Sequence, residues 1–292
     1  LLQDLDDEAT RSATTAVAAA DAAGDDGAAA DALATLAVLV VDDPDHAAEL
    51  LRDAAARARR AGDLVTEQRC NHNLVTTYYY AGRLDEAAAE LTRTKERARA
   101  SGLEWTTFGI SARFFEVLIR YCSGDLTPPD RIVEHAPSAI RTAVPEVLAL
   151  FDAIALYSAV ARGDADAIER GQALRPMWER DGQVALLSGG PTIDALTWAG
   201  RLDEAVELAT ALVEHMGRTW DDYFLGGIWL AALALAALAD GAELDRRAGA
   251  DPALKVRHGH DLLEHARATA VRGRPRGGRL GPEGAAWLVR AE

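Results

Sequence analysis

Apolar residues recur along most of the chain at spacings of three and four positions. In residues 63–80 they stand at Leu64, Val65, Cys70, Leu74, Val75, Tyr78 and Tyr79, and in residues 84–100 at Leu84, Ala87, Ala88 and Leu91. This spacing gathers apolar side chains on one face of an α-helix, whereas a half-buried strand would alternate. The short β-branched run at residues 38–41 is stopped by Asp42-Asp43-Pro44. We therefore predict an all-α protein.

The chain also repeats itself. The heptapeptide Ala-Gly-Arg-Leu-Asp-Glu-Ala at residues 81–87 recurs unchanged at residues 199–205. One set of glycines, spaced 37 to 42 residues apart, is Gly82, Gly124, Gly163, Gly200 and Gly241. A second set lies about halfway between, at Gly62 and Gly102 and less regularly at Gly182 and Gly217. A turn roughly every 20 residues predicts an array of paired helices.

Each of these turns has the same physical basis. Glycine ends a helix because it adopts the left-handed conformation that other residues avoid. Asp85, Asp164 and Asp203 follow closely and favour the start of the next helix through capping or the helix dipole. The expected pairs are 28–41 with 45–61, 63–80 with 83–100, 103–122 with 128–142, 145–162 with 164–180, 191–199 with 202–216, and 219–239 with 255–272. We also expect a helix before Gly24, a final helix from Pro282, and irregular chain at 241–254 and 273–281.

Composition narrows the possible functions. Of the 292 residues, 49% are hydrophobic, much of that alanine, and the net charge is −15. Such a charge repels nucleic-acid phosphates and anionic membrane surfaces, so neither is expected as a partner. The longest apolar run, residues 228–239, is too short to span a bilayer, and no signal peptide precedes the helices. We expect a cytoplasmic protein in which Cys70 and Cys122 are buried free thiols.

We expect residues 1–292 to form one helical-repeat domain. The chain starts at Leu1 without a methionine and stops at Glu292 inside a predicted helix. These two features predict a fragment of a longer protein.

One unit resembles the tetratricopeptide consensus through the spacing of Leu74, Val75, Tyr78, Gly82, Ala87 and Leu91. That resemblance implies antiparallel helix-hairpin repeats wound into a right-handed superhelical solenoid. In such an array the first helix of each pair lines the concave surface.

The whole chain is similar to the helical-repeat region of the large ATP-binding LuxR-type transcriptional regulators. The stretches that carry this similarity are Arg272-Gly273-Arg274-Pro275 and Leu280-Gly281-Pro282-Glu283-Gly284-Ala285-Ala286-Trp287-Leu288. The resemblance implies an ATPase domain before the repeats and a DNA-binding helix-turn-helix after them. It also implies that the repeats sense an inducer or a partner protein.

Sequence motifs of catalysis are missing. The chain contains no G-x-x-x-x-G-K-[ST], G-x-G-x-x-G or G-x-S-x-G, so we expect neither ATP binding nor catalysis, and no cofactor. His258, His260, Glu264 and His265 lie close together, but their spacing does not match the two histidines four apart that hold zinc. A solvated face is favoured over a metal site there. The arginines between 267 and 279 are interpreted as a solvated connector, with a phosphate or partner contact as the alternative.

Aromatic residues offer the best candidates for binding. Core packing explains most of them, but the consecutive residues Tyr78, Tyr79 and Tyr80 cannot all face one side of a helix. Aromatic rings beside polar groups on first helices would suit a ligand or peptide groove. The candidate residues are Arg69, His72, Asn73, Tyr80, Trp105 and Arg113. If they form one site, at least three should converge on a single cavity.

The leading hypothesis is therefore a ligand- or protein-sensing repeat region of a bacterial transcriptional regulator, which acts by binding a small-molecule effector, protein or peptide in its concave groove. The alternative is a tetratricopeptide-like protein–protein interaction scaffold without a small-molecule ligand. An enzyme on a helical toroid is disfavoured because no acid–base or nucleophile set is recognisable.

Overall fold

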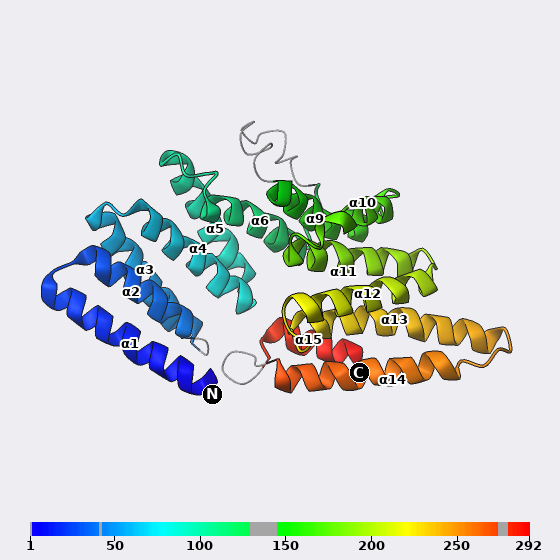
Figure 1. Cartoon of the computed structure of the whole chain (residues 1–292). Helices are drawn as coiled ribbons and strands as arrows, with labels where there is room; N and C mark the ends of the chain where they lie inside the picture. The colour runs from blue at the N-terminus through cyan, green and yellow to red at the C-terminus, as the bar shows by residue number, and fades with distance from the viewer. Residues whose placement is uncertain (1, 41–42, 129–144, 274–279) are drawn as a thin grey trace. The chain divides into compact units, whose positions relative to one another are not determined.

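The structure is a computed structural model that describes residues 2–40, 43–128, 145–273 and 280–292 (Figure 1). Within these ranges the chain forms thirteen α-helices, one short 3₁₀ helix and no strand, which confirms the all-α prediction. It divides into two compact units, Leu1–Ser123 (unit 1) and Gly124–Glu292 (unit 2).

Unit 1 contains six helices: α1 (Leu2–Ala23), α2 (Asp26–Leu39), α3 (Pro44–Ala61), α4 (Leu64–Tyr80), α5 (Leu84–Ala100) and α6 (Thr107–Cys122). Each helix packs against the next, and α4 also contacts α2 and α6. We call α2, α4 and α6 the first-helix row of unit 1. Its core combines small alanines with larger side chains such as Leu51, Leu74 and Phe115.

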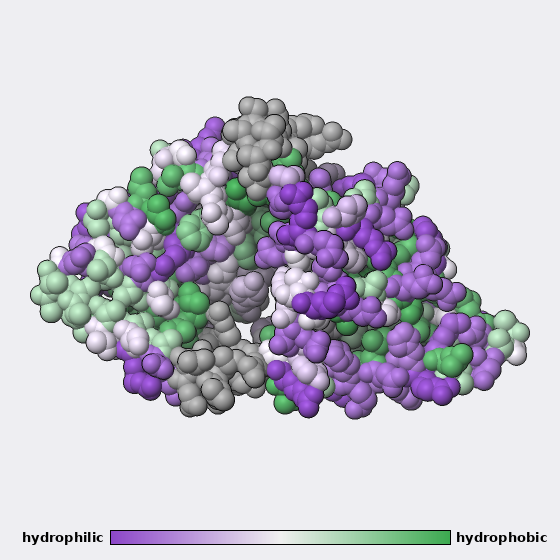
Figure 2. All heavy atoms as spheres, viewed as in Figure 1, coloured by the Kyte–Doolittle hydropathy of each residue, from purple (hydrophilic) through white to green (hydrophobic). Residues whose placement is uncertain are grey.

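Unit 2 contains α9 (Pro145–Arg162), α10 (Ala167–Ala173), the 3₁₀ helix η1 (Arg175–Met177), α11 (Gly182–Trp198), α12 (Leu202–Thr219), α13 (Gly226–Arg247), α14 (Ala253–Arg272) and α15 (Pro282–Ala291). Here α11 contacts both α9 and α13, and α13 contacts α15. We call α9, α11, α13 and α15 the first-helix row of unit 2. The viewed face of unit 2 is mainly hydrophilic, with smaller hydrophobic patches (Figure 2).

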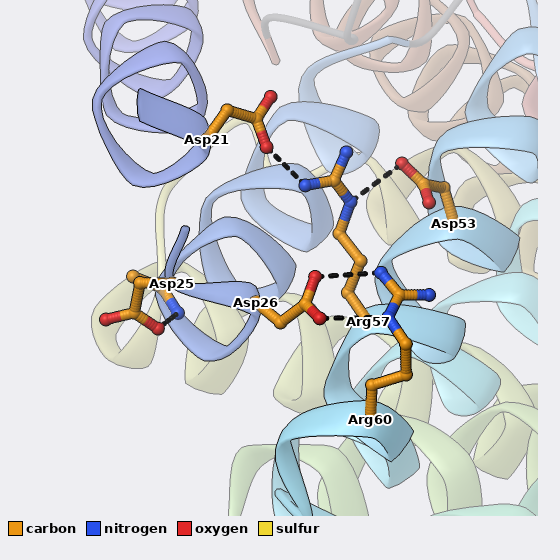
Figure 3. Close-up of polar contacts among 7 residues, drawn as sticks. Asp21, Asp25, Asp26, Asp53, Arg57 and Arg60 are labelled. Atoms are coloured by element: carbon orange, nitrogen blue, oxygen red, sulfur yellow. Dashed lines mark hydrogen bonds and ion pairs between the residues drawn. The ribbon is translucent and has the colours of Figure 1, made fainter. Parts of the chain in front are cut away.

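Charged pairs on the surface add to the packing of the first three helices. Arg57 of α3 bonds to Asp21 of α1 and, at 3.1 Å, to Asp53 of its own helix. Arg60 donates to both oxygens of Asp26 at 2.8 and 2.9 Å (Figure 3), and this hydrogen bonding holds the pKa of Asp26 below its ordinary value. These side chains are partly or largely exposed, so each pair contributes little free energy and mainly fixes which helices face each other.

The glycine turns were predicted correctly at six positions. Gly62, Gly82, Gly102, Gly124, Gly163 and Gly200 all have φ between 68° and 81°, and the space around their absent side chains is open. Conformation, and not crowding, therefore requires glycine there. Asp85 and Asp203 lie in the first turns of α5 and α12 without capping them, which leaves the dipole as their role.

Three predicted turn glycines are wrong. Gly241 lies inside α13, which continues to Arg247 and ends near Gly249 (φ 73°), so the expected irregular stretch begins later. Gly217 lies inside α12. Gly182 begins α11, where Asp181 accepts hydrogen bonds from the Gln183 and Val184 amides.

Several predicted boundaries also need correction. The helix expected at 191–199 begins at Gly182 and contains Gly189, Gly190 and Pro191 in its interior. The helix expected at 164–180 is broken into α10 and η1, with Pro176 in the 3₁₀ turn. Most of the helix expected at 128–142 falls on residues 129–144, which lie outside the described residues.

The two thiols differ from each other. Cys70 is buried as predicted, and burial raises the pKa of its thiol to about 12. Cys122 is exposed at the end of α6, so that prediction was wrong.

By length and composition, α13 is the one helix of the described chain that could cross a membrane. It is longer than the apolar run recognised in the sequence. Most of its apolar stretch is buried inside unit 2, as in the core helix of a folded domain.

Candidate functional site

The aromatic residues of the helices are unevenly distributed. Every Phe, Trp and Tyr within a described α-helix lies on α4, α6, α9, α11, α13 or α15. All six of these helices belong to the first-helix rows. The intervening helices α3, α5, α10, α12 and α14 have none. Because aromatic rings supply large contact areas for recognition, the first-helix rows are the candidate binding surfaces.

In unit 1 an aromatic cluster surrounds Phe115 of α6. The His72 ring lies 5.7 Å from Phe115 and the Tyr80 ring 6.5 Å from it, both centroid to centroid. Phe108 lies 5.5 Å from His72. Burial lowers the pKa of His72, so the neutral imidazole is the favoured form. Tyr80 is 64% exposed, which gives this cluster a solvent-facing edge.

The other predicted site residues lie in different surroundings. The Arg113 guanidinium is 4.5 Å from the Trp105 ring centroid and 3.1 Å from a Glu104 carboxylate oxygen. Arg69 is directed to α2, where it pairs with Asp31 at 2.9 Å. Asn73 is half-buried on α4.

Thus the structure joins Trp105 with Arg113, and joins His72 with Tyr80 through Phe115. It does not bring Arg69 to either group. None of the six predicted residues lines either of the two cavities described next.

Both cavities lie in unit 2. One, of about 170 Å³, lies between α10, η1, α11 and α12 and is lined in part by Arg175, Glu204 and Glu207. The other, of about 490 Å³, is lined by α12, the following turn and α14. In the second cavity Tyr223 stacks on His265 at 5.5 Å, which gives that histidine a packing partner. Among the described residues, no cluster of His, Cys, Asp or Glu has the arrangement of a metal site.

Unit 2 carries a second aromatic cluster, which crosses its first-helix row. Tyr157 of α9 and Trp229 of α13 stack at 6.0 Å, and Trp229 lies 6.2 Å from Trp287 of α15. Gly190 of α11 makes room for this arrangement, because a Cβ there would lie 2.0 Å from a ring carbon of Trp229. Gly190 is therefore required by the close approach of the Trp229 ring, whereas the neighbouring Gly189 is required by Leu212 of α12, which lies 2.4 Å from where its Cβ would be.

The same side of α11 also carries a carboxylate and a further tryptophan. Gly190, Asp194 and Trp198 are spaced four apart, so they lie along one stripe of the helix. Asp194 is the only charged residue of α11, and Trp198 is 61% exposed. Burial raises the pKa of Asp194, and the charge of Arg290 opposes this only in part.

Sequence reasoning missed this second cluster. The helix was predicted only over residues 191–199, so the first half of α11 and its periodicity were not recognised. A single charge in an otherwise apolar helix, four residues from an aromatic side chain, was the signal that could have identified Asp194 and Trp198.

No protein-family model, curated protein or solved structure matches the chain.

Proposed function

We propose that this chain is a tetratricopeptide-like helical-repeat module that acts by binding a protein or peptide partner along its first helices. The concentration of helical aromatic residues on the first-helix rows carries this proposal. The left-handed glycine turns and the packing of each helix against the next within each unit support the repeat assignment. The superhelical arrangement of the repeats is proposed from the tetratricopeptide resemblance alone.

The shape of the surface favours an extended partner over a small molecule. Pockets for small ligands are commonly about 300–1,000 Å³. The cavity that reaches α11 has only about 170 Å³, and the larger one is lined by α12 and α14, outside the first-helix rows. Partly exposed aromatic rings that come from several helices, as Tyr157, Trp229 and Trp287 do, suit a peptide or protein segment better.

We further propose that the module belongs to a transcriptional regulator of the LuxR type and senses its partner for the flanking ATPase and DNA-binding domains. The stretch at residues 280–288 supports this, because it carries the sequence resemblance and provides Trp287 of the aromatic cluster. The test is to sequence the gene on both sides of this segment. Coding sequence for other kinds of domain would leave the binding module standing and remove the regulator assignment.

Peptide selection tests the binding function. A library of random dodecapeptides is selected against the pure chain, and bound peptides are located by hydrogen exchange. We expect slower exchange in α4 and α6 or in α9, α11, α13 and α15 than in α5, α12 and α14. Protection confined to the intervening helices, or a failure to select any peptide, would contradict the proposal.

A further inference from the structure

The Asp194 carboxylate lacks a cationic partner in contact with it. Within the described chain, neither a hydrogen bond nor an ion pair reaches its side chain, although it is half-buried. Two other acidic groups withdrawn from solvent are paired with cations: the half-buried Glu116 bonds to Lys95 at 2.6 Å, and the buried Glu67 is bound by two arginines. A carboxylate that has lost part of its hydration gains strongly from an incoming cation.

The rings near Asp194 are suited to the same kind of group. Arg290 already places its guanidinium 5.0 Å from the Trp287 ring centroid, so this surface accommodates a stacked cation within the chain itself. Indole faces attract guanidinium and ammonium groups, most strongly where water is partly excluded. Trp229 and the exposed Trp198 extend this indole-rich surface on either side of Asp194.

Glu283 adds further negative charge on α15. Burial raises the pKa of its carboxyl, and a hydrogen bond involving Trp287 lowers it in part. The net charge of −15 favours positively charged partners over the whole chain.

We propose that the surface formed by Asp194, Trp198, Trp229 and Trp287, which we call the α11 surface, binds a basic peptide segment. An arginine or lysine of the peptide pairs with Asp194 and stacks on a neighbouring indole. This proposal rests on the proposed function and specifies its partner.

The extent of the α11 surface favours a peptide over a single small cation. It crosses α11, α13 and α15, and neighbouring helix axes are typically about 8–10 Å apart. The span of roughly 20 Å corresponds to about six residues of extended chain. A peptide with basic residues at intervals can thus reach Asp194 and Glu283 together.

The test uses the full chain and a fluorescein-labelled peptide of four Gly-Arg repeats, with binding measured by fluorescence anisotropy at 150 mM salt. Four Gly-citrulline repeats provide a neutral peptide of the same shape. We expect Asp194→Asn to weaken binding of the arginine peptide roughly tenfold, the usual effect of losing a charge-assisted pair. Trp198→Leu should weaken it several-fold, and the citrulline peptide should bind no tighter to wild type than to Asp194→Asn.

Glu169→Gln is the matched control, because it removes one negative charge from an exposed position on α10. We expect it to change affinity less than about twofold, as screening reduces distant charge effects at this salt. Equal weakening by Asp194→Asn and Glu169→Gln would reduce the interaction to non-specific charge attraction and overturn the proposal. Unchanged binding by Asp194→Asn would overturn it as well.

The peptide selection distinguishes this proposal from the more general one. If selected peptides protect α11 and α13 but carry acidic or neutral sequences, the binding function stands and the basic partner is wrong. Thermal melts of each variant show whether a loss of binding comes from unfolding.

Discussion

The two units treat a carboxylate withdrawn from solvent on a first helix in opposite ways. In unit 1, Glu67 of α4 is 2% exposed and accepts hydrogen bonds from Arg59 of α3 and Arg97 of α5, at 2.9 and 3.0 Å. Burial alone would raise the pKa of Glu67, but the bonds from these arginines leave it below the ordinary value. In unit 2, burial raises the pKa of Asp194, because only the more distant charge of Arg290 opposes it.

This difference separates a structural carboxylate from a candidate binding carboxylate. Glu67 links three consecutive helices, and both of its oxygens are used. Among the described residues no hydrogen bond or ion pair joins Asp194 to another helix, and its neighbours on the stripe are Gly190 and the exposed Trp198. Glu67 is the more deeply buried of the two carboxylates, yet its charge is satisfied within the fold.

The largest expected effect comes from breaking the Glu67 contacts. Glu67→Gln keeps the shape but removes the charge that both arginines bond to. Because Arg59 and Arg97 are 58% and 41% exposed, they can return to water, so we expect a loss of about 2 kcal/mol and not the larger cost of stranding buried charges. Urea unfolding measures this loss in the free energy of unfolding. Glu96→Gln is the control, because Glu96 is exposed to solvent on α5. An equal loss of stability in this variant would contradict the structural role of Glu67.

The second prediction tests the close packing of rings on α11. Gly190→Ala should destabilise the chain by about 1–2 kcal/mol, because Trp229 must move to admit the new methyl group. Gly241→Ala is the matched control inside α13, where the new methyl group meets the flexible end of Lys255 at 3.1 Å and Leu202 at an ordinary contact distance of 3.8 Å. Because alanine has a higher helix propensity than glycine, this variant should keep the stability of the wild type or gain up to about 1 kcal/mol. Equal melting temperatures for the two variants would refute the packing argument.

The two units also differ in how well the sequence predicted their helix boundaries. In unit 1 the helix boundaries are close, because Gly62, Gly82 and Gly102 end helices through their backbone conformation, which a local sequence pattern reveals. In unit 2, Gly190 and Gly241 both lie inside helices, but only at Gly190 does a neighbouring helix, through Trp229, explain the missing side chain. A glycine's local and tertiary roles look alike in a single sequence.

The candidate site shows the same limit. His72 and Tyr80 were chosen from one helix, and their meeting around Phe115 follows from helical spacing on α4 and α6. Arg69 was chosen on the same basis, but its pairing with Asp31 depends on how α4 packs on α2, which no local pattern contains. The cluster at Gly190 draws on α9, α11, α13 and α15, so it could be found only in the folded unit.

The third prediction concerns the half-buried imidazole of His72 in unit 1. Burial lowers the pKa of His72 below its ordinary 6.5, so the unfolded chain binds this proton more readily than the folded chain. Stability from this group is therefore present above about pH 6.5 and is lost as the pH falls through that value toward the lower folded pKa. We expect His72→Phe to remove this pH-dependent loss of stability, which should be below about 1 kcal/mol. His46 is exposed on α3, so His46→Gln should leave the pH dependence of stability unchanged. Denaturant melts between pH 5 and pH 8 would show it, and identical pH profiles for wild type and His72→Phe would count against the burial effect.

The smallest expected effect is a gain of stability in Asp194→Asn, whereas Glu67→Gln and Gly190→Ala should lose stability. It bears most directly on the comparison of Glu67 with Asp194. Because burial raises the pKa of Asp194 above 3.8, its contribution to stability is present at low pH and is lost as the pH rises through the folded pKa. Wild type therefore carries a cost at pH 7 that Asp194→Asn lacks, and we expect the variant to be more stable by up to about 0.5 kcal/mol. The difference in stability between wild type and Asp194→Asn should shrink toward pH 3. The loss of stability in Glu67→Gln should shrink as well, because the pKa of the Glu67 carboxyl lies below its ordinary 4.5.

A variant that folds better but binds a basic peptide less well would show that Asp194 serves binding at the expense of stability. A clear loss of stability in Asp194→Asn would instead place this carboxylate with Glu67, as a structural residue.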